Sequence, residues 1–99
     1  MWYSDYKFKT TFDSDFTIAE KFGASAIKDT FNRAFNEWKN DYEYLTELVL
    51  ILNWKLWAHY ENGNMEYARL YNDLWEKAQD YGYTHLSGDE LTYFIRTLD

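Results

Sequence analysis

The chain has 99 residues, of which 22% are aromatic, with no cysteine and no proline, and its formal net charge is −7. This length predicts one domain with its own core, and the lack of cysteine excludes disulfides, thiolate metal sites and a cysteine nucleophile. The acidic balance disfavours direct binding of nucleic acid. The longest apolar stretch, Leu48–Leu52, is too short to cross a bilayer, and Met1 opens no signal-peptide pattern, so we expect a cytoplasmic protein without a membrane partner.

The first segment, residues 2–12, differs from the rest of the chain in its periodicity. Tyr6, Phe8, Thr10 and Phe12 alternate with Lys7, Lys9 and Thr11. A period of two predicts extended backbone. We expect either a short strand that pairs with the same segment of another subunit or an arm that lies along the helices. The predicted extended N-terminal arm covers residues 1–15.

Helical periodicity begins after this arm. Thr17-Ile18-Ala19-Glu20 has the form of a capping box, which predicts the start of a short helix that Gly23 ends. The next helix is expected over residues 24–39. Its predicted inward face is formed by apolar residues at spacings of three and four, namely Ile27, Phe31, Ala34, Phe35 and Trp38.

The third predicted helix starts near Asn40, which can cap it with Glu43 in the box position. Around residues 48–52 it is apolar on nearly every side, so we expect it to be the central helix. Its expected inward positions are Tyr44, Leu45, Leu48, Val49, Ile51, Leu52, Leu56 and Trp57. Asn62-Gly63-Asn64 then predicts a turn.

A fourth helix is expected over residues 65–81 and a fifth after Ser87-Gly88-Asp89-Glu90, which has the form of a second capping box. The expected inward residues of these two helices are Ala68, Tyr71, Leu74, Trp75 and Ala78, followed by Leu91, Phe94, Ile95 and Leu98. The predicted fold is therefore all-α: a single domain over residues 1–99, with an arm and a compact bundle of four to five helices over residues 16–99.

Candidate catalytic and metal-binding groups are sparse. His59 and Glu61 are two residues apart and point in different directions on a helix, and His85 has no second histidine at ligand spacing. Asp13 and Asp15 lack the further ligands of a calcium loop, so we expect them to favour the start of the first helix. No nucleophile elbow or phosphate loop is present. The sequence predicts no enzyme, no cofactor and no metal site.

Negative charge is concentrated in the second part of the chain. Residues 40–99 carry eleven acidic and four basic side chains, whereas residues 1–39 carry six of each. We expect the acids of the third and fourth helices, together with rings that do not fit the inward faces, to bind a basic protein surface. These candidate residues are Glu43, Glu47, Glu66, Asp73, Glu76, Asp80, Trp54, Tyr60 and Tyr67. The alternative is that the charge only maintains solubility and the rings complete a core or a homodimer interface.

Four segments, Phe16–Gly23, Lys28–Lys39, Tyr44–Val49 and Leu91–Phe94, resemble a family of small proteins from phages and prophages of gut bacteria, known as a domain of unknown function. The resemblance implies an origin in a mobile genetic element and supplies no catalytic residues. Small, acidic, single-domain phage proteins often resemble anti-defence inhibitors, among them anti-CRISPR proteins that occupy the nucleic-acid channel of a Cas nuclease.

The resulting expectation is an accessory protein in the cytoplasm of a bacterial host cell. It would bind and inhibit a host protein that handles nucleic acid, with carboxylates standing in for phosphates opposite Lys and Arg side chains. The alternative function is a non-enzymatic assembly module that forms a homodimer through the aromatic arm.

Overall fold

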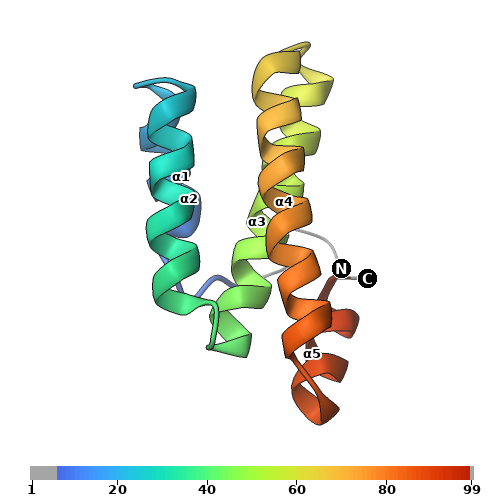
Figure 1. Cartoon of the computed structure of the whole chain (residues 1–99). Helices are drawn as coiled ribbons and strands as arrows, with labels where there is room; N and C mark the ends of the chain where they lie inside the picture. Colours follow the sequence, from blue (N-terminus) through green and yellow to red (C-terminus); the bar gives the residue numbers. More distant parts are fainter. Residues whose placement is uncertain (1–6, 99) are drawn as a thin grey trace.

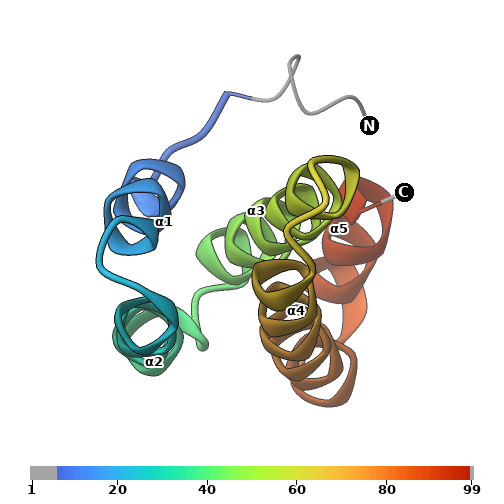
Figure 2. The ribbon, with the colours of Figure 1, turned by 90° about the horizontal axis from the view of Figure 1, so that it is seen from above.

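The computed structural model describes residues 7–98, and within them it confirms the all-α prediction. Five helices follow one another along the chain: α1 (Phe12–Glu20), α2 (Ala24–Trp38), α3 (Tyr42–Glu61), α4 (Met65–His85) and α5 (Gly88–Leu98). Figure 1 shows that α1 and α2 form one hairpin and that α3 and α4 form a second, longer one. The view from above in Figure 2 places α3 at the centre, between α1, α4 and α5.

The core lies between the two hairpins, and α3 contributes most to it. Leu45, Leu48, Val49, Ile51 and Leu52 of this helix are buried, as the nearly continuous apolar stretch predicts. The other buried core residues outside α3 are Phe12, Phe16, Ala19, Ile27, Phe31, Ala34, Phe35, Ala68, Tyr71, Ala78, Leu86 and Phe94. The bundle is therefore built around α3, which contacts each of the other helices.

The start of α1 corrects the predicted boundary of the arm. The helix begins at Phe12, and residues 12–15 belong to it, because Phe12 and Phe16 are one turn apart and both are buried. Asp13 and Asp15 lie in the first turn, as expected for acids near a helix N-terminus. Thr17 lies inside the helix and starts no capping box: its hydroxyl donates to the carbonyl oxygen of Asp13.

The predicted strand is not present in the part of the chain that the structure describes. Residues 7–11 contain no strand, and residues 1–6 lie outside the described residues. The cap of α3 also differs from the prediction, since Asp41 rather than Asn40 accepts the backbone N–H groups of Glu43 and Tyr44. Asn40 instead accepts a hydrogen bond from the hydroxyl of Tyr81 at 3.0 Å.

The end of α4 extends four residues beyond the predicted Tyr81, and Gly82 lies inside the helix. Gly82 is buried because the ring of Phe94 from α5 packs directly on it: a Cβ atom there would be 2.8 Å from two ring carbons. This close approach seats α5 at the end of the bundle where α3 begins and α4 ends (Figure 1). The other half of α3 is left without this cover, so Trp57, predicted to point inward, is 53% exposed.

The inward face of α5 follows the prediction at Leu91, Phe94 and Leu98 and departs from it at Ile95. Phe94 is buried, with Leu91 and Leu98 partly buried against the core, but Ile95 is 38% exposed. Thr97 takes the buried position instead.

Candidate functional site

The predicted acidic residues of α4 lie on the surface of that helix. Glu66, Asp73, Glu76 and Asp80 are all exposed. Two basic side chains of the same helix, Arg69 and Lys77, are also exposed, and the ammonium group of Lys77 lies 5.6 Å from the centre of the Phe35 ring. The spacing of three, four and seven residues places these acids on one side of α4, which we call the acidic face of α4.

The two predicted acids of α3 do not join this face. Glu43 is half-buried and forms an ion pair with Lys9. The hydrogen bond and the charge of Glu43 raise the pKa of the Lys9 ammonium group. Glu43 therefore interacts with the described start of the chain and is not a free contact for a partner.

Glu47 corrects the expectation of an exposed carboxylate, because it is fully buried. Its Oε1 accepts the backbone N–H groups of Lys9 and Thr10, both at 2.9 Å, and the Thr10 hydroxyl at 2.7 Å. Its Oε2 also accepts the N–H of Lys9 at 3.0 Å. A buried carboxylate requires such donors, and here they come from a segment 37 and 38 residues away in the sequence. Glu47 therefore anchors the chain that leads into α1 and cannot contact a partner.

The predicted aromatic residues divide between the surface and the interior. Trp54 is 39% exposed and Tyr60 is 53% exposed. Trp57, which the sequence placed inward, joins this surface and packs edge-on against Tyr60 with ring centres 5.7 Å apart. Tyr67 corrects the prediction, because it is half-buried and its hydroxyl donates to the carbonyl oxygen of Glu20 at 3.2 Å. It therefore ties α4 to α1.

A polar cluster that the sequence did not predict lies between α1, α3 and α4. The ammonium group of Lys55, which is 7% exposed, lies 3.3 Å from Oε2 of Glu20 and donates to the Thr17 hydroxyl at 2.7 Å. Oε2 of Glu20 also accepts the Tyr71 hydroxyl at 2.6 Å, and its Oε1 lies 3.1 Å from Nε2 of His59. His59 is partly buried and stacks on the ring of Tyr71.

The groups of this cluster satisfy one another. Burial opposes ionisation of Glu20, but the hydrogen bonds from Tyr71 and His59 and the charge of Lys55 outweigh it, so the pKa of Glu20 lies below its ordinary value. Burial raises the pKa of the Tyr71 hydroxyl, and the adjacent Glu20 carboxylate raises it further. Each of these polar groups therefore has a partner within the cluster, and the cluster joins the two hairpins.

Metal binding receives no support from the described residues. Over residues 7–98, no three His, Asp or Glu side chains come together in an arrangement that could hold a metal ion. His85 is exposed and stacks on Tyr81 of its own helix.

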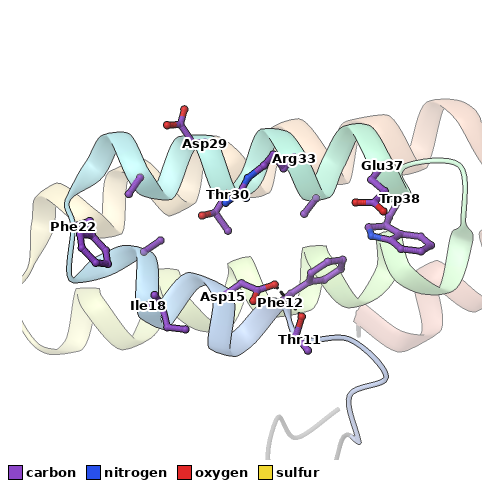
Figure 3. Close-up of a pocket in the computed structure, with 13 residues that line it drawn as sticks. Thr11, Phe12, Asp15, Ile18, Phe22, Asp29, Thr30, Arg33, Glu37 and Trp38 are labelled. Atoms are coloured by element: carbon purple, nitrogen blue, oxygen red, sulfur yellow. Dashed lines mark hydrogen bonds between the residues drawn. The ribbon is translucent and has the colours of Figure 1, made fainter.

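A groove of about 550 Å³ runs along the outer side of the α1–α2 hairpin (Figure 3). Its apolar lining includes Ile18 and Phe22, which are 55% and 77% exposed and which no sequence pattern marked as a site. A weak signal was present in the sequence, because Ile18 of α1 and Phe22 of the turn after it are two large apolar residues spaced by four.

Comparison with protein-family models, with curated proteins and with solved structures gave no match. The resemblance to phage and prophage proteins therefore stays a prediction. Within residues 7–98, every helix is too short or too polar to span a bilayer.

Proposed function

We propose that this chain is a non-enzymatic binding protein that attaches to a basic surface of another protein through the acidic face of α4. The observation that carries the proposal is the exposure of four carboxylates along one side of a 21-residue helix. Carboxylates pair well with Arg and Lys side chains of a partner, and a face of one sign increases the rate of the encounter.

The charge density of this face distinguishes between two forms of the proposal: contact with a local basic patch, and imitation of a whole nucleic-acid duplex. Glu66 and Asp80 are 14 residues apart, which is about 21 Å along a helix. A DNA duplex of that length carries about twelve phosphate charges. The acidic face of α4 carries four, partly offset by Arg69 and Lys77. These values favour contact with a local basic patch over imitation of a whole duplex.

The exposed rings of α3 supply the apolar part of such a contact. Trp54, Trp57 and Tyr60 lie in the half of α3 that α5 does not cover, and aromatic side chains of this kind are frequent anchors in protein interfaces. A host protein that handles nucleic acid, such as a Cas nuclease, has the basic residues that this arrangement would cover. Inhibition would then follow from occupation of its nucleic-acid-binding surface.

Self-association through residues 1–12 is the second candidate, but the described contacts favour it less. The backbone of Lys9 and Thr10 is bound by Glu47 of the same chain, so this part of the arm is already engaged. A dimer that dissociates when residues 1–12 are deleted would restore this candidate.

The test is a pull-down from bacterial lysate with the parent protein and two charge-reversal variants, at low and high salt. Asp73→Lys with Asp80→Lys removes two acids of the acidic face of α4. Asp89→Lys with Glu90→Lys changes the net charge equally on α5, where both acids are exposed. We expect the parent and the α5 variant to retain one partner at low salt and to release it at high salt, and the α4 variant to lose it.

Equal capture by the α4 variant and the parent, with the same salt dependence, would show that the acidic face of α4 is not the contact. Circular dichroism of all three proteins checks that the substitutions leave the helices intact.

A further inference from the structure

The groove between α1 and α2 is a second surface, separate from the acidic face of α4. Gly23, with φ of 109°, lets the chain reverse direction between the two helices, so that α1 and α2 lie side by side. Figure 3 shows the groove between them, with Phe22 near one end and Trp38 near the other. The hairpin is packed on α3 and α4 by its opposite side, which leaves the groove open to a partner.

The lining of the groove combines apolar and polar side chains, with Asp15 and Thr30 between Phe22 and Trp38 (Figure 3). Phe12, Ala19 and Ala34 are buried side chains at its base, while Ile18 and Phe22 stand at one wall with more than half of their surface exposed. The small side chains of Ala19 and Ala34 leave room for side chains of a partner to enter. Covering the exposed apolar side chains of Ile18 and Phe22 would stabilise the complex.

The length of the groove fits a helix. Ala26 and Trp38, both in its lining, are twelve residues apart on α2, which corresponds to about 18 Å or a little more than three helical turns. A helix laid between α1 and α2 would contact both in the manner of a three-helix bundle, with apolar side chains at positions i, i+4 and i+7 pointing into the groove.

The charges in the groove select among possible occupants. Three carboxylates, those of Asp15, Asp29 and Glu37, and one guanidinium, that of Arg33, belong to its lining. This excess of acid favours an occupant with Lys or Arg beside its apolar residues. A second copy of this chain is disfavoured, because its own groove has the same acidic excess and its net charge is −7.

We propose that this groove binds an amphipathic helix of another protein, with a row of apolar residues on one side and basic residues on its flanks. The proposal does not depend on the acidic face of α4, which lies on a different helix. The probe for it is a synthetic fluorescent peptide of about fourteen residues, with Leu at i, i+4, i+7 and i+11 and with Lys and Ala elsewhere.

The measurement is the fluorescence anisotropy of this peptide as the protein is added, at low and high salt. We expect saturable binding with a dissociation constant in the micromolar range, weakened by salt. A matched peptide with Glu in place of every Lys should bind at least about tenfold more weakly. Failure of the Lys peptide to bind at millimolar protein, or equal binding of both peptides, would overturn the proposal.

Variants locate the binding site. Asp29→Lys with Glu37→Lys should weaken the Lys peptide about tenfold and strengthen the Glu peptide. Ile18→Gln removes an apolar contact without changing the charge and should weaken both, and since Ile18 is exposed, the variant should keep its helices. Asp73→Lys with Asp80→Lys on α4 makes the same change in net charge and should leave the affinity within about twofold of the parent.

Equal weakening by the α4 and groove charge variants would assign the peptide to general electrostatic attraction and would overturn the proposal. A concentration-dependent dimer of the parent that Ile18→Gln dissociates would show that a second copy occupies the groove, which would also overturn it.

Discussion

The ion pair between Lys55 and Glu20 allows a quantitative test of how α1 is held on α3. Their side chains are 7% and 18% exposed, and Nζ lies 3.3 Å from Oε2. At an effective dielectric constant of about 20 the attraction is about 5 kcal/mol, much of it offset by the loss of hydration. Removal of one partner leaves the other charge buried, but Lys55 retains Thr17 and Asp13, and Glu20 retains Tyr71. We therefore expect each single substitution to cost about 2 kcal/mol, less than the roughly 3–5 kcal/mol that removal of one partner from a buried pair usually costs.

The experiment is a double-mutant cycle of Glu20→Gln and Lys55→Met, with unfolding in urea followed by circular dichroism. The double variant should lose less stability than the sum of the single variants, with a coupling energy of about 1–3 kcal/mol. Each single variant should lower Tm by about 8–15 °C. Lys28→Met, which changes an exposed lysine of α2, should change stability by less than about 0.5 kcal/mol. Coupling below about 0.5 kcal/mol would refute the assigned role of the pair.

The same cycle predicts a pH dependence. Because the folded state holds the pKa of Glu20 below its ordinary value of 4.5, the carboxylate contributes stability that is fully present above that value. This contribution is lost as the pH falls through the lower folded pKa. The difference in stability between the parent and Glu20→Gln should therefore be largest at neutral pH and shrink in acid. A difference that stays constant from neutral pH into acid would contradict the charged state assigned to Glu20.

Two further substitutions test the seating of α5 and the anchoring of the arm. Gly82→Ala should destabilise the protein by about 1–3 kcal/mol in urea unfolding, since the new methyl group would overlap the ring of Phe94. Glu47→Gln removes a carboxylate that accepts N–H groups of Lys9 and Thr10, so it should cost about 1–3 kcal/mol and speed hydrogen exchange of both amides.

Each of these substitutions has a matched control. Combining Gly82→Ala with Phe94→Leu should recover part of the cost of the alanine, whereas a Gly82→Ala variant more stable than the parent would show that helix propensity outweighs the clash. For Glu47→Gln the control is Glu43→Gln. Glu43 lies one helical turn from Glu47 but is only half-buried, so its substitution should lower the free energy of unfolding less. Unchanged exchange at Lys9 and Thr10 in Glu47→Gln would show that the arm is held by other contacts.

Most helices of this fold can be predicted from local sequence, since periodicity and turn residues act over a few positions. The α2 helix and the turn at Gly63 follow the predicted pattern closely. The start of α1 was harder to predict, because Phe8, Thr10 and Phe12 fit a period of two whereas Phe12 and Phe16 fit a helical spacing. Burial of both Phe12 and Phe16 favoured the helix, and such burial depends on the rest of the bundle.

The positions of charged residues were predicted less well, for a related reason. An acid on a helix is expected at the surface, and Glu66, Asp73, Glu76 and Asp80 follow that rule. Glu47 departs from it because its hydrogen-bond donors arrive from the distant start of the chain. Distant partners of this kind have no signature in local sequence spacing.

The uneven distribution of charge over the two hairpins gives the molecule a permanent dipole moment. Residues 1–39 are neutral in sum, whereas residues 40–99, which form α3, α4 and α5, carry the whole net charge of −7. A positively charged object at a distance would rotate the protein so that α3–α5 turns toward it before contact. The hairpin of α1 and α2 adds nothing to the net charge, so its groove attracts a ligand only at short range, through its own acidic side chains and its apolar contacts.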